Sequence, residues 1–336
     1  MGLYLNDGWI NASALINCPA PFVVAVGGRG IGKTYGVMRE LLFRQKPFIY
    51  LRRTQVQIDA CKVQELSPFA AICRDENRYI ESRTISKYVA GFVEVCGDME
   101  TLRAIGLALS TFANVRGFDA SGYEYVVFDE FIPEKHERPI PYEGDAFLNV
   151  LETVNRNREL QGREPVKVIM LSNANKLDSP ILQAIGALAP LDKMTRSGKE
   201  WGRFYDGALE IFRYMESPIS AKKKNTALYR LSNSDDFSRM SIENAFSAET
   251  YYNVCSKPLG EYRPIASTQG ITVFRHKSRR EYYITQGIKS ENVYNNTPEQ
   301  QREFCRKTVS AYEALCRGEV YFASASAKVI FENIWR

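Results

Sequence analysis

The stretch Gly27-Gly28-Arg29-Gly30-Ile31-Gly32-Lys33-Thr34 decides the fold of this chain. It follows the apolar run Phe22-Val23-Val24-Ala25-Val26 and opens a segment, residues 32–43, that is predicted to be helical. Read from Gly27, it fits the pattern G-x-x-x-x-G-K-[ST] of a phosphate-binding loop, or P-loop. Its glycines let the backbone turn tightly and direct successive N–H groups at a phosphate, and the helix N-terminus adds a partial positive charge. The stretch therefore predicts binding of a nucleoside triphosphate.

Two residues at the end of the P-loop carry the chemistry expected of an ATP site. Lys33 is expected to reach the β- and γ-phosphates of ATP, and Thr34 to place its hydroxyl on Mg²⁺. A chance glycine-rich turn between a strand and a helix is the alternative interpretation. The nucleotide is expected to contact the whole loop: Gly27, Gly28, Arg29, Gly30, Ile31, Gly32, Lys33 and Thr34.

The segment Tyr125-Val126-Val127-Phe128-Asp129-Glu130 places two acids directly after an apolar run. This pattern predicts a buried strand with carboxylates at its catalytic end, the Walker B motif. Asp129 is then expected in the Mg²⁺ shell, and Glu130 is expected to orient and polarise the attacking water. The long separation from the P-loop leaves room for an intervening strand, as in additional-strand ATPases that use a catalytic Glu. An acidic pair that merely closes a strand is the alternative.

The rest of the first two thirds of the chain fits a mostly parallel sheet. The predicted fold class is α/β: a P-loop NTPase of the additional-strand, catalytic-Glu type, followed by a smaller α+β C-terminal domain. Apolar runs bounded by turn residues predict the remaining strands, and a β-hairpin insertion is expected among them. The predicted strands cover residues 48–51, 105–110, 166–171 and 204–212, and the hairpin covers residues 78–81 and 88–95.

A helix is predicted over residues 144–160, because apolar residues from Phe147 to Val154 step by four and three along one face. At about 100° per residue, Arg158 continues this stripe, whereas Arg156 points about 200° away from Val154. Arg158 is therefore expected to lean on its own domain. Arg156 is expected to be free to reach a neighbouring molecule.

The strand predicted over residues 166–171 ends in the polar residues Ser172-Asn173-Ala174-Asn175. A polar side chain at this strand tip commonly senses the γ-phosphate in additional-strand ATPases. Asn173 and Ser172 are the candidates for that role. A simple strand-ending turn is the alternative.

Three further groups of residues are candidate ligand contacts. Tyr4 or Trp9 in the N-terminal segment could stack on a base, although both are common packing residues. Arg52-Arg53 end a predicted strand at the edge where ligands of open α/β sheets collect, so they could contact phosphate or DNA. A solvated surface pair is the alternative for them. Lys222-Lys223-Lys224 could touch a phosphate backbone or form a solvated face.

The C-terminal part is more basic than the rest of the chain. From Phe237 to Arg336 there are fourteen Lys and Arg against ten Glu, and no Asp. Strand-like runs alternate with polar turns, and a helix is predicted near residues 298–318, followed by a strand-like tail. The basic turn of residues 275–280 is the best nucleic-acid contact candidate there. The expected domains are the ATPase domain (1–215), a linker or lid (216–239) and the C-terminal domain (240–336).

The composition excludes several classes of protein. The charged fraction of 25% and the hydrophobic fraction of 45% are those of an ordinary globular protein. No apolar run is long enough for a membrane span, so no membrane partner is expected. The seven scattered cysteines form no C-x-x-C pair, which favours reduced cytosolic thiols. With only two histidines, a histidine-based zinc site or catalytic triad has little material.

With these motifs in place, the chain resembles the DNA-packaging ATPase of phi29-like podophages. The resemblance covers most of residues 20–175 and is carried by segments that recur in the order and approximate spacing of that family. Beyond residue 215 it is mainly one of length and layout. The matching segments are Val26–Thr34, Phe48–Arg53, Val127–Ile132, and Thr153–Glu159 with Leu171–Ala174 downstream.

The resemblance implies a ring-shaped motor, pentameric in the family, that hydrolyses ATP with Mg²⁺ and translocates double-stranded DNA into a preformed procapsid. It implies that Arg156 acts in trans as an arginine finger on the ATP of the neighbouring subunit, and that Arg29 couples nucleotide state to the ring. The implied partners are DNA, the capsid portal or connector and, in some members, a packaging RNA. The implied location is the host cytoplasm, transiently at the portal vertex.

The resemblance also implies an RNase H-like C-terminal domain derived from a nuclease. Because residues 237–336 contain no Asp, an Asp-rich two-metal cluster cannot be assembled there, and no nuclease activity is expected. Two other functions remain open from the residues alone. One is a helicase-like or replication-initiator ATPase that acts on single strands. The other is a signalling NTPase with an appended β-rich interaction domain.

Overall fold

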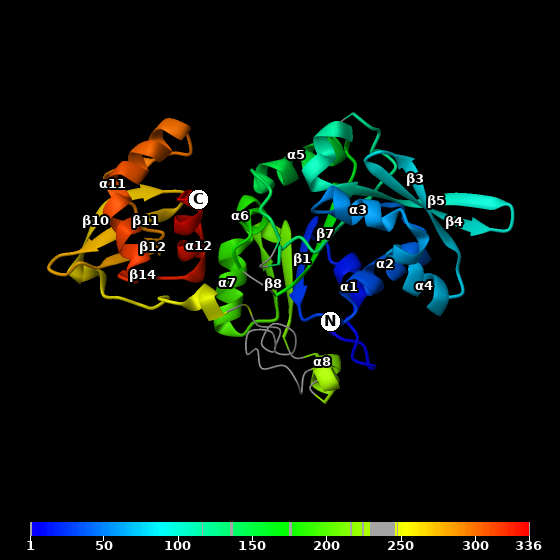
Figure 1. The fold of residues 1–336 in the computed structure, drawn as a ribbon, viewed down its shortest axis with the longest axis horizontal. Helices are drawn as coiled ribbons and strands as arrows, with labels where there is room; N and C mark the ends of the chain where they lie inside the picture. Colours follow the sequence, from blue (N-terminus) through cyan, green and yellow to red (C-terminus); the bar gives the residue numbers. More distant parts are fainter. Residues whose placement is uncertain are drawn as a thin grey trace. The chain divides into compact units, whose positions relative to one another are not determined.

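The structure, a computed structural model, describes residues 2–115, 117–134, 137–174, 177–215, 217–223, 225–228, 246 and 248–335. The chain divides into two compact units, Met1–Phe246 and Ser247–Arg336 (Figure 1). Among the described residues, no helix is long and apolar enough to cross a membrane. The predicted linker of residues 216–239 lies partly outside the described residues, so its boundaries stay a prediction.

The first unit is built on one mixed sheet. Among the described residues, nine strands form it in the order β3-β4-β5-β2-β6-β7-β1-β9-β8. The central strands from β5 to β9 are parallel, and β3, β4 and β8 are antiparallel additions at the two edges. The strands are β1 (Phe22–Gly27), β2 (Phe48–Arg52), β3 (Ile80–Ser86), β4 (Val89–Cys96), β5 (Met99–Ala108), β6 (Tyr125–Asp129), β7 (Lys167–Asn173), β8 (Trp201–Phe204) and β9 (Leu209–Tyr214).

Strand β7 lies between β1, which leads into the P-loop, and β6, which carries the acidic pair. It is parallel to both, and its register pairs Asn173 with Gly27 and Leu171 with Asp129. This order confirms the additional-strand architecture predicted from the sequence. The carboxyl ends of β1, β7, β6 and β2 therefore meet at one edge of the sheet, where ligands of open α/β sheets bind.

Short helices connect these strands. The α-helices are α1 (Ala12–Asn17), α2 (Lys33–Phe43), α3 (Gln55–Cys61), α4 (Ala70–Asp75), α5 (Glu143–Asn155), α6 (Pro180–Ala184), α7 (Leu188–Ser197) and α8 (Pro218–Lys223). The 3₁₀ helices are η1 (Gln64–Leu66), η2 (Leu109–Val115), η3 (Glu159–Gln161) and η4 (Tyr205–Gly207).

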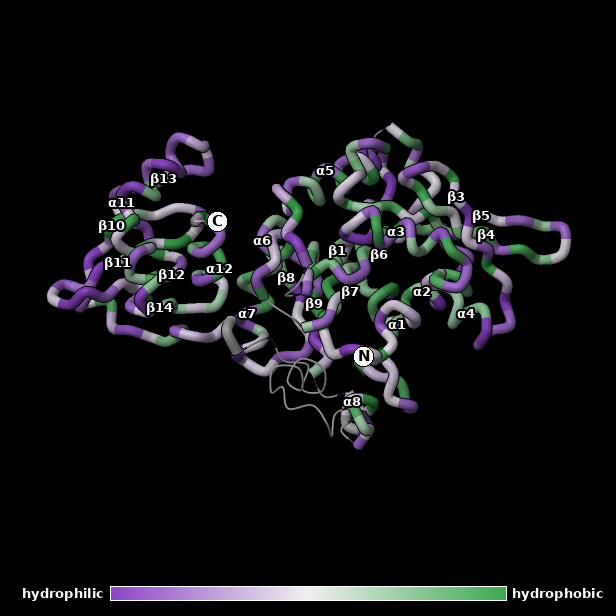
Figure 2. The backbone as a smooth tube through the Cα atoms, in the orientation of Figure 1, coloured by the Kyte–Doolittle hydropathy of each residue, from purple (hydrophilic) through white to green (hydrophobic). Residues whose placement is uncertain are grey.

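Helices cover both faces of the central sheet. Successive residues of a strand point to opposite sides, so each central strand presents apolar side chains to both faces. On one face, Ala25 of β1 belongs to a buried cluster with Val37 and Leu41 of α2. On the other, the ring of Phe128 in β6 packs against that of Phe147 in α5, with centroids 5.1 Å apart. Burial on both sides explains why these strands read as continuous apolar runs. Figure 2 shows hydrophobic residues concentrated along them.

The second unit combines a smaller sheet with two helices. Among its described residues, five strands form the order β13-β10-β11-β12-β14. Strands β10 to β12 form an antiparallel meander, β13 is parallel to β10, and β14 is parallel to β12. The elements are β10 (Tyr262–Thr268), β11 (Ile271–His276), β12 (Tyr282–Gln286), β13 (Val293–Tyr294), α11 (Pro298–Cys316), β14 (Val320–Phe322) and α12 (Ala325–Ile334), preceded by η5 (Ala248–Tyr251) and η6 (Leu259–Glu261).

This second unit agrees with the predicted smaller α+β domain, but the predicted strand-like tail is wrong beyond β14. Residues Ala325–Ile334 form helix α12 instead. Ser324 caps this helix by accepting a hydrogen bond from the Ala327 N–H at 3.0 Å. Val329, Ile330 and Phe331 are then buried on its inner side. A capping serine followed by apolar residues at helical spacing was the signal for this helix.

The predicted strand over residues 204–212 is also different. It begins at the last residue of β8, crosses a turn at Tyr205–Gly207 and continues into β9, and the two strands are antiparallel. Tyr205 and Asp206 both have positive φ, which is a turn conformation. The predicted single strand is therefore part of a β-hairpin.

Candidate active site

The P-loop has the conformation that its glycines predict. Strand β1 ends at Gly27 and helix α2 begins at Lys33. Gly30 and Gly32 have φ values of 62° and 87°, in the left-handed region that glycine adopts without strain. A Cβ at Gly32 would also lie 3.0 Å from Cε3 of Trp9. Conformation and close packing both require glycine at this position.

Lys33 is buried inside the loop that it follows. Its ammonium donates hydrogen bonds to the carbonyl of Gly28 at 2.6 Å and to Oδ1 of Asn173 at 3.1 Å. Burial lowers the pKa of Lys33 to about 7, the Asp129 carboxylate opposes this shift, and the Lys223 ammonium adds to it. The site therefore concentrates positive charge where a phosphate group would compensate it.

We expect Lys33→Met to raise the thermal midpoint at pH 7. In the unfolded chain the pKa of Lys33 is near its ordinary value of 10.5. Between about pH 7 and this value the unfolded state binds more protons than the folded state, so this group's contribution to stability rises with pH. Methionine removes the cost of burying the charge while keeping most of the volume. Differential scanning calorimetry should show a gain that shrinks from pH 7 towards pH 10.

Lys46→Met provides the control for this prediction, because Lys46 is exposed and pairs with Glu124 on the surface. Surface ion pairs contribute about 1 kcal/mol or less, so this control should change the midpoint little. A lower midpoint for Lys33→Met at pH 7 would show that the hydrogen bonds of the ammonium outweigh its desolvation.

Thr34 and Asp129 meet at the carboxyl edge of the sheet. The Thr34 hydroxyl donates to Oδ1 of Asp129 at 2.7 Å, and the Tyr50 hydroxyl donates to Oδ2 at 2.9 Å. Burial raises the pKa of Tyr50, so its hydroxyl remains a donor. A hydroxyl and a carboxylate side by side are the hard oxygen ligands that Mg²⁺ takes from a protein when phosphates and water supply the rest. These two residues fit the predicted metal role.

Glu130 directly follows β6 and has a φ of 53°, which is unusual for a residue with a side chain. Such strain clusters at functional sites, where the surrounding structure maintains it. The side chain of Glu130 is half exposed. Arg52, at the end of β2, donates to Oδ2 of Asp129 at 2.8 Å and also binds the Glu130 carboxylate. A single guanidinium thus holds both acids of the Walker B motif.

The two residues predicted as γ-phosphate sensors, at the end of β7, have different environments. Asn173 accepts a hydrogen bond from Lys33, so it faces the predicted phosphate site. Ser172 is buried, and its hydroxyl accepts a hydrogen bond from the Ile132 N–H at 3.3 Å. Ser172 therefore fixes the chain that follows the acidic pair, and Asn173 is the remaining sensor candidate.

The two arginines that end β2 have different environments, and neither is a solvated surface residue. Arg53 is fully buried and pairs with Glu143 at 2.6 Å and with Glu137 at 2.7 Å. Because Glu143 lies in the first turn of α5, this ion pair fixes the start of that helix beside β2. Arg52 remains in the site, and Arg53 supports the structure around it. The sequence did not distinguish these two roles.

A cavity of about 810 Å³ opens beside the P-loop. Trp9 and Tyr35 line it together with Gly32 and Gly36, and Trp9 is 44% exposed. A pocket of this size with aromatic walls can hold a nucleoside. The other aromatic candidate, Tyr4, instead packs edge-on against Tyr214, with ring centroids 5.6 Å apart. The structure thus keeps Trp9 as a candidate for contact with a base.

The arginines after α5 are separated as predicted, but for a different reason. The helix ends at Asn155, five residues earlier than expected, and Arg156 has a φ of 47°. Arg158 is buried, and its guanidinium donates to the carbonyls of Ser121 at 3.0 Å and Tyr123 at 2.6 Å. Arg156 is exposed, and its guanidinium donates to the carbonyls of Phe118 at 2.9 Å and Thr153 at 3.3 Å. Arg158 thus supports its own domain, whereas Arg156 is accessible from solvent.

Arg156 lies far from the P-loop of its own chain. Helix α5 begins at the carboxyl edge of the sheet, where Glu143 meets Arg53, and its thirteen residues span about 20 Å. At its far end, Oδ1 of Asn155 accepts a hydrogen bond from the Val166 N–H, just before β7 begins. Arg156 is therefore at the opposite edge of the sheet from the phosphate site.

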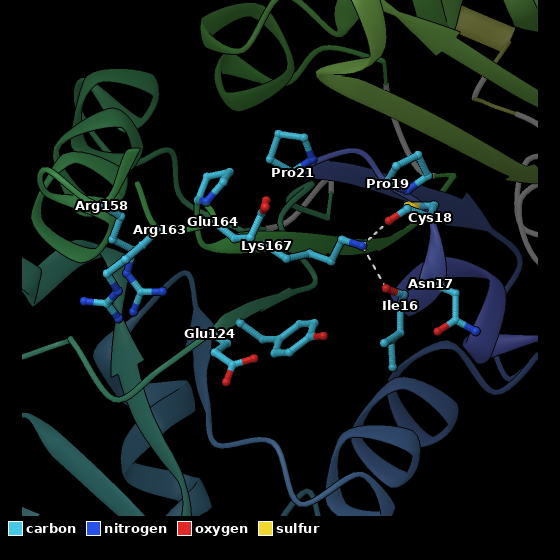
Figure 3. Close-up of a pocket in the computed structure, with 12 residues that line it drawn as sticks. Ile16, Asn17, Cys18, Pro19, Pro21, Glu124, Arg158, Arg163, Glu164 and Lys167 are labelled. Atoms are coloured by element: carbon cyan, nitrogen blue, oxygen red, sulfur yellow. Dashed lines mark hydrogen bonds between the residues drawn. The ribbon is translucent and has the colours of Figure 1, made fainter. Parts of the chain in front are cut away.

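A second cavity of about 530 Å³ also lies at this opposite edge (Figure 3). It is lined by residues that precede β1, by residues at or just before the start of β6 and β7, and by Arg158 and Arg163. Lys167 extends across it and donates to the Ile16 carbonyl at 2.8 Å. Burial lowers the pKa of Lys167. The carboxylates of the Walker B motif are absent from this lining, so the cavity is separate from the predicted nucleotide site.

Three contacts of the site escaped prediction from the sequence. Tyr50 holds Asp129, Arg52 holds both acids, and Lys223 of α8 donates to the Arg29 carbonyl. Tyr50 and Arg52 are two residues apart on β2, so their side chains point to the same face of the sheet. The alternation of side chains along a strand could have predicted this. Lys223 is remote in sequence from the P-loop, and no pattern indicated its position. The side chain of Arg29 itself pairs with Glu134.

The chain matches the protein family described as Podovirus DNA encapsidation protein (Gp16) over residues 8–259. Two curated relatives, the DNA packaging proteins of Bacillus phage PZA and Bacillus phage phi29, are each 25% identical to it, over 237 and 236 residues. Each alignment covers 67% of this chain and 62% of the relative. The chain thus spans less than two thirds of the length of these relatives.

Two solved structures share its fold. One is the bacteriophage Phi-29 viral genome packaging motor assembly, with a TM-score of 0.66 at 20% identity over 98% of this chain and 99% of that chain. The other is the Phi-28 gp11 DNA packaging motor, with a TM-score of 0.64 at 20% identity over 97% of this chain and 96% of that chain. Because the family match spans most of its length, the chain belongs to the podovirus DNA encapsidation protein family.

Proposed function

We propose that this protein is an ATPase motor that translocates double-stranded viral DNA into a preformed procapsid. The observation that carries the proposal is the convergence of five predicted residues at one edge of the sheet. Lys33 contacts Asn173, and Thr34 contacts Asp129, which is followed by Glu130. A phosphate-binding lysine, a metal-binding pair and a candidate base are the parts that phosphoryl transfer requires.

In the proposed reaction the loop binds the triphosphate through its backbone N–H groups, and Lys33 exchanges its carbonyl partners for phosphate oxygens. Mg²⁺, held by Thr34 and Asp129, would neutralise charge that develops on the phosphates. Glu130 orients a water molecule in line with the γ-phosphate and accepts its proton. Asn173 contacts the γ-phosphate from the tip of β7.

Arg52 links this chemistry to the adjacent strand β2. While the Arg52 guanidinium pairs with Glu130, it competes with the attacking water for that carboxylate. Release of Glu130 from Arg52 would then be a step before hydrolysis. The second ion pair of Arg52, with Asp129, keeps the guanidinium anchored in the site when this happens.

Hydrolysis is proposed to occur at the interface between subunits of a homo-oligomeric ring, pentameric as the resemblance implies. Arg156 is exposed and lies about one helix length from the P-loop edge of its own sheet, so it cannot serve its own nucleotide. Supplied by a neighbouring subunit, it would stabilise charge on the transferring phosphoryl group. Arg29 would carry nucleotide state to the ring through its ion pair with Glu134.

Support for DNA as the substrate comes from two sources. Two relatives are named DNA packaging proteins. In addition, Arg275 near the end of β11 and Lys277, Arg279 and Arg280 in the turn after it are exposed, and cations of this kind bind a phosphate backbone. The capsid portal, and a packaging RNA in some members, are further proposed partners, in the host cytoplasm at the portal vertex.

The second unit is proposed to bind without cleaving. Residues 237–336 include no Asp. In its sheet, the buried hydroxyls of Ser267 and Thr272 bond each other at 2.7 Å, and Ser267 also contacts Ser290 at 3.0 Å. Hydroxyls paired in this way offer no carboxylate cluster for two metal ions.

The test of the proposed function is ATP hydrolysis by the full chain with and without nucleic acid. We expect duplex DNA with portal to raise the steady-state rate several-fold, and we expect forked DNA to remain base-paired. Equal rates with and without duplex DNA and portal would contradict the motor. Unwinding of forked DNA would instead favour the alternative, a helicase-like or replication-initiator ATPase.

A separate prediction concerns the base. If the cavity beside the P-loop holds adenine, then Trp9→Ala should raise the Kd for ATP about tenfold, because base–aromatic stacking is worth about 1–3 kcal/mol. Binding of inorganic tripolyphosphate should be unchanged. Trp201→Ala is the matched control, since Trp201 is exposed to a similar degree on strand β8. Isothermal titration calorimetry can compare the three proteins. Equal loss for ATP and tripolyphosphate would assign Trp9 to packing.

A further inference from the structure

We propose that Lys223 of helix α8 is a γ-phosphate contact in cis, through which α8 distinguishes ATP from ADP. The inference rests on the proposed function, because it assumes that the P-loop binds a triphosphate. It adds a residue that neither the P-loop motif nor the acidic pair supplies.

Lys223 reaches the P-loop from the last turn of α8. Its ammonium donates a hydrogen bond to the carbonyl of Arg29, in the middle of the loop. It also lies against Gly30, where an added Cβ would be 2.8 Å from Nζ. Among the described residues, no carboxylate forms an ion pair with Lys223. A cation that contacts only backbone at the rim of an anion site is available to a phosphate.

The position of this ammonium indicates which phosphate it would meet. At the C-terminal end of the loop, Lys33 serves the β- and γ-phosphates and Thr34 serves the metal. Lys33 folds back over Gly28, so the Gly28–Gly30 segment flanks the outer end of a triphosphate. Lys223 lies beside Gly30, close enough for its charge to affect Lys33. It therefore faces the γ-position.

Electrostatics favour the same partner. Partial burial lowers the pKa of Lys223, and burial with the charge of Lys223 lowers that of Lys33. A phosphate between the two ammonium groups would replace repulsion with attraction, and charge-assisted hydrogen bonds of this kind are the strong ones. ADP, which lacks the γ-phosphate, would leave Lys223 on the Arg29 carbonyl.

Helix α8 is held near the nucleotide at its other end as well. Pro218, its first residue, packs so closely on Gly8 that a Cβ there would lie 2.9 Å from the proline Cβ. Gly8 precedes Trp9, which lines the cavity beside the loop. A nucleotide-dependent shift of Lys223 would therefore move a helix that contacts both sides of the site.

The experiment compares nucleotide affinities of Lys223→Ala with those of Lys222→Ala, using ATPγS and ADP without DNA. Lys222 is the adjacent residue on α8, and its side chain is exposed. Lys223→Ala should raise the Kd for ATPγS about tenfold or more and that for ADP less than about twofold, because a hydrogen bond to a charged group is lost. Lys222→Ala should change neither. Lys223→Arg should recover most of the ATPγS affinity.

Three outcomes would overturn the inference: no change for either nucleotide, equal losses for both, or an equal effect of Lys222→Ala. Equal losses would mean that Lys223 only stabilises the loop, and a matching fall in thermal midpoint would support that. Wild-type protein that binds ATPγS but is not stimulated by duplex DNA would contradict the motor function alone. The affinity comparison would still decide the role of Lys223.

Discussion

Arg156→Ala should lower DNA-stimulated ATP hydrolysis about 10³-fold, the scale of an arginine finger, while leaving the affinity for ATP nearly unchanged. The affinity should survive because Arg156 lies at the opposite sheet edge from the P-loop of its own chain. The rate should fall because the guanidinium stabilises charge only as the phosphoryl group transfers. Steady-state hydrolysis and equilibrium binding of ATPγS measure the two effects separately.

Arg163→Ala is the matched control for this substitution. Arg163 is also exposed, and it bonds the Ser121 carbonyl at 3.1 Å, much as Arg156 bonds the Phe118 carbonyl at 2.9 Å. If both substitutions reduce hydrolysis equally, their effect is on the loop that they contact, and the finger assignment fails. Loss of ATPγS binding in Arg156→Ala would equally contradict it.

Glu130→Gln should reduce hydrolysis about 10²- to 10⁴-fold, the usual contribution of a general base. Glutamine keeps the shape of the side chain and can still accept a hydrogen bond from Arg52, but it cannot take a proton from water. ATP binding should persist, because Lys33, Thr34 and Asp129 are unchanged. Single-turnover hydrolysis of prebound ATP isolates this chemical step from binding and release.

The control for the base is Glu124→Gln, which changes a glutamate at the other end of strand β6. Glu124 is exposed and pairs with Lys46 on the surface. Its substitution should leave the single-turnover rate almost unchanged. A Glu130→Gln protein that hydrolyses ATP at more than about a tenth of the wild-type rate would remove Glu130 from the role of base.

Most of the candidate phosphate site could be predicted from the sequence, because its parts are local. The order of strand, glycine-rich loop and helix determines where Lys33 and Thr34 lie. An apolar strand ending in two acids similarly places Asp129 and Glu130 at the same sheet edge. The position of β7 between β1 and β6 then brings Asn173 to Lys33.

The contacts that could not be predicted depend on tertiary packing. The end of α5 at Asn155 follows from side-chain bonds: its Oδ1 accepts from the Val166 N–H and its Nδ2 donates to Glu159. Helical periodicity contains no information about these competing partners. Although the predicted helix was too long, its periodicity agreed with the observed exposure of Arg156 and burial of Arg158. The contact of Lys223 with the P-loop could not be predicted, because α8 is distant from the loop in the sequence and meets it only in the folded chain.

The measurement that tests the shared active site most directly mixes two inactive variants. Lys33→Ala lacks the P-loop lysine but keeps Arg156, whereas Arg156→Ala keeps the P-loop but lacks the finger. In a mixed ring, a Lys33→Ala subunit can supply Arg156 to the intact P-loop of its neighbour. We predict that mixing the variants with duplex DNA and portal restores ATP hydrolysis well above the sum of the separate rates. Hydrolysis no higher than that sum would contradict an active site shared between subunits.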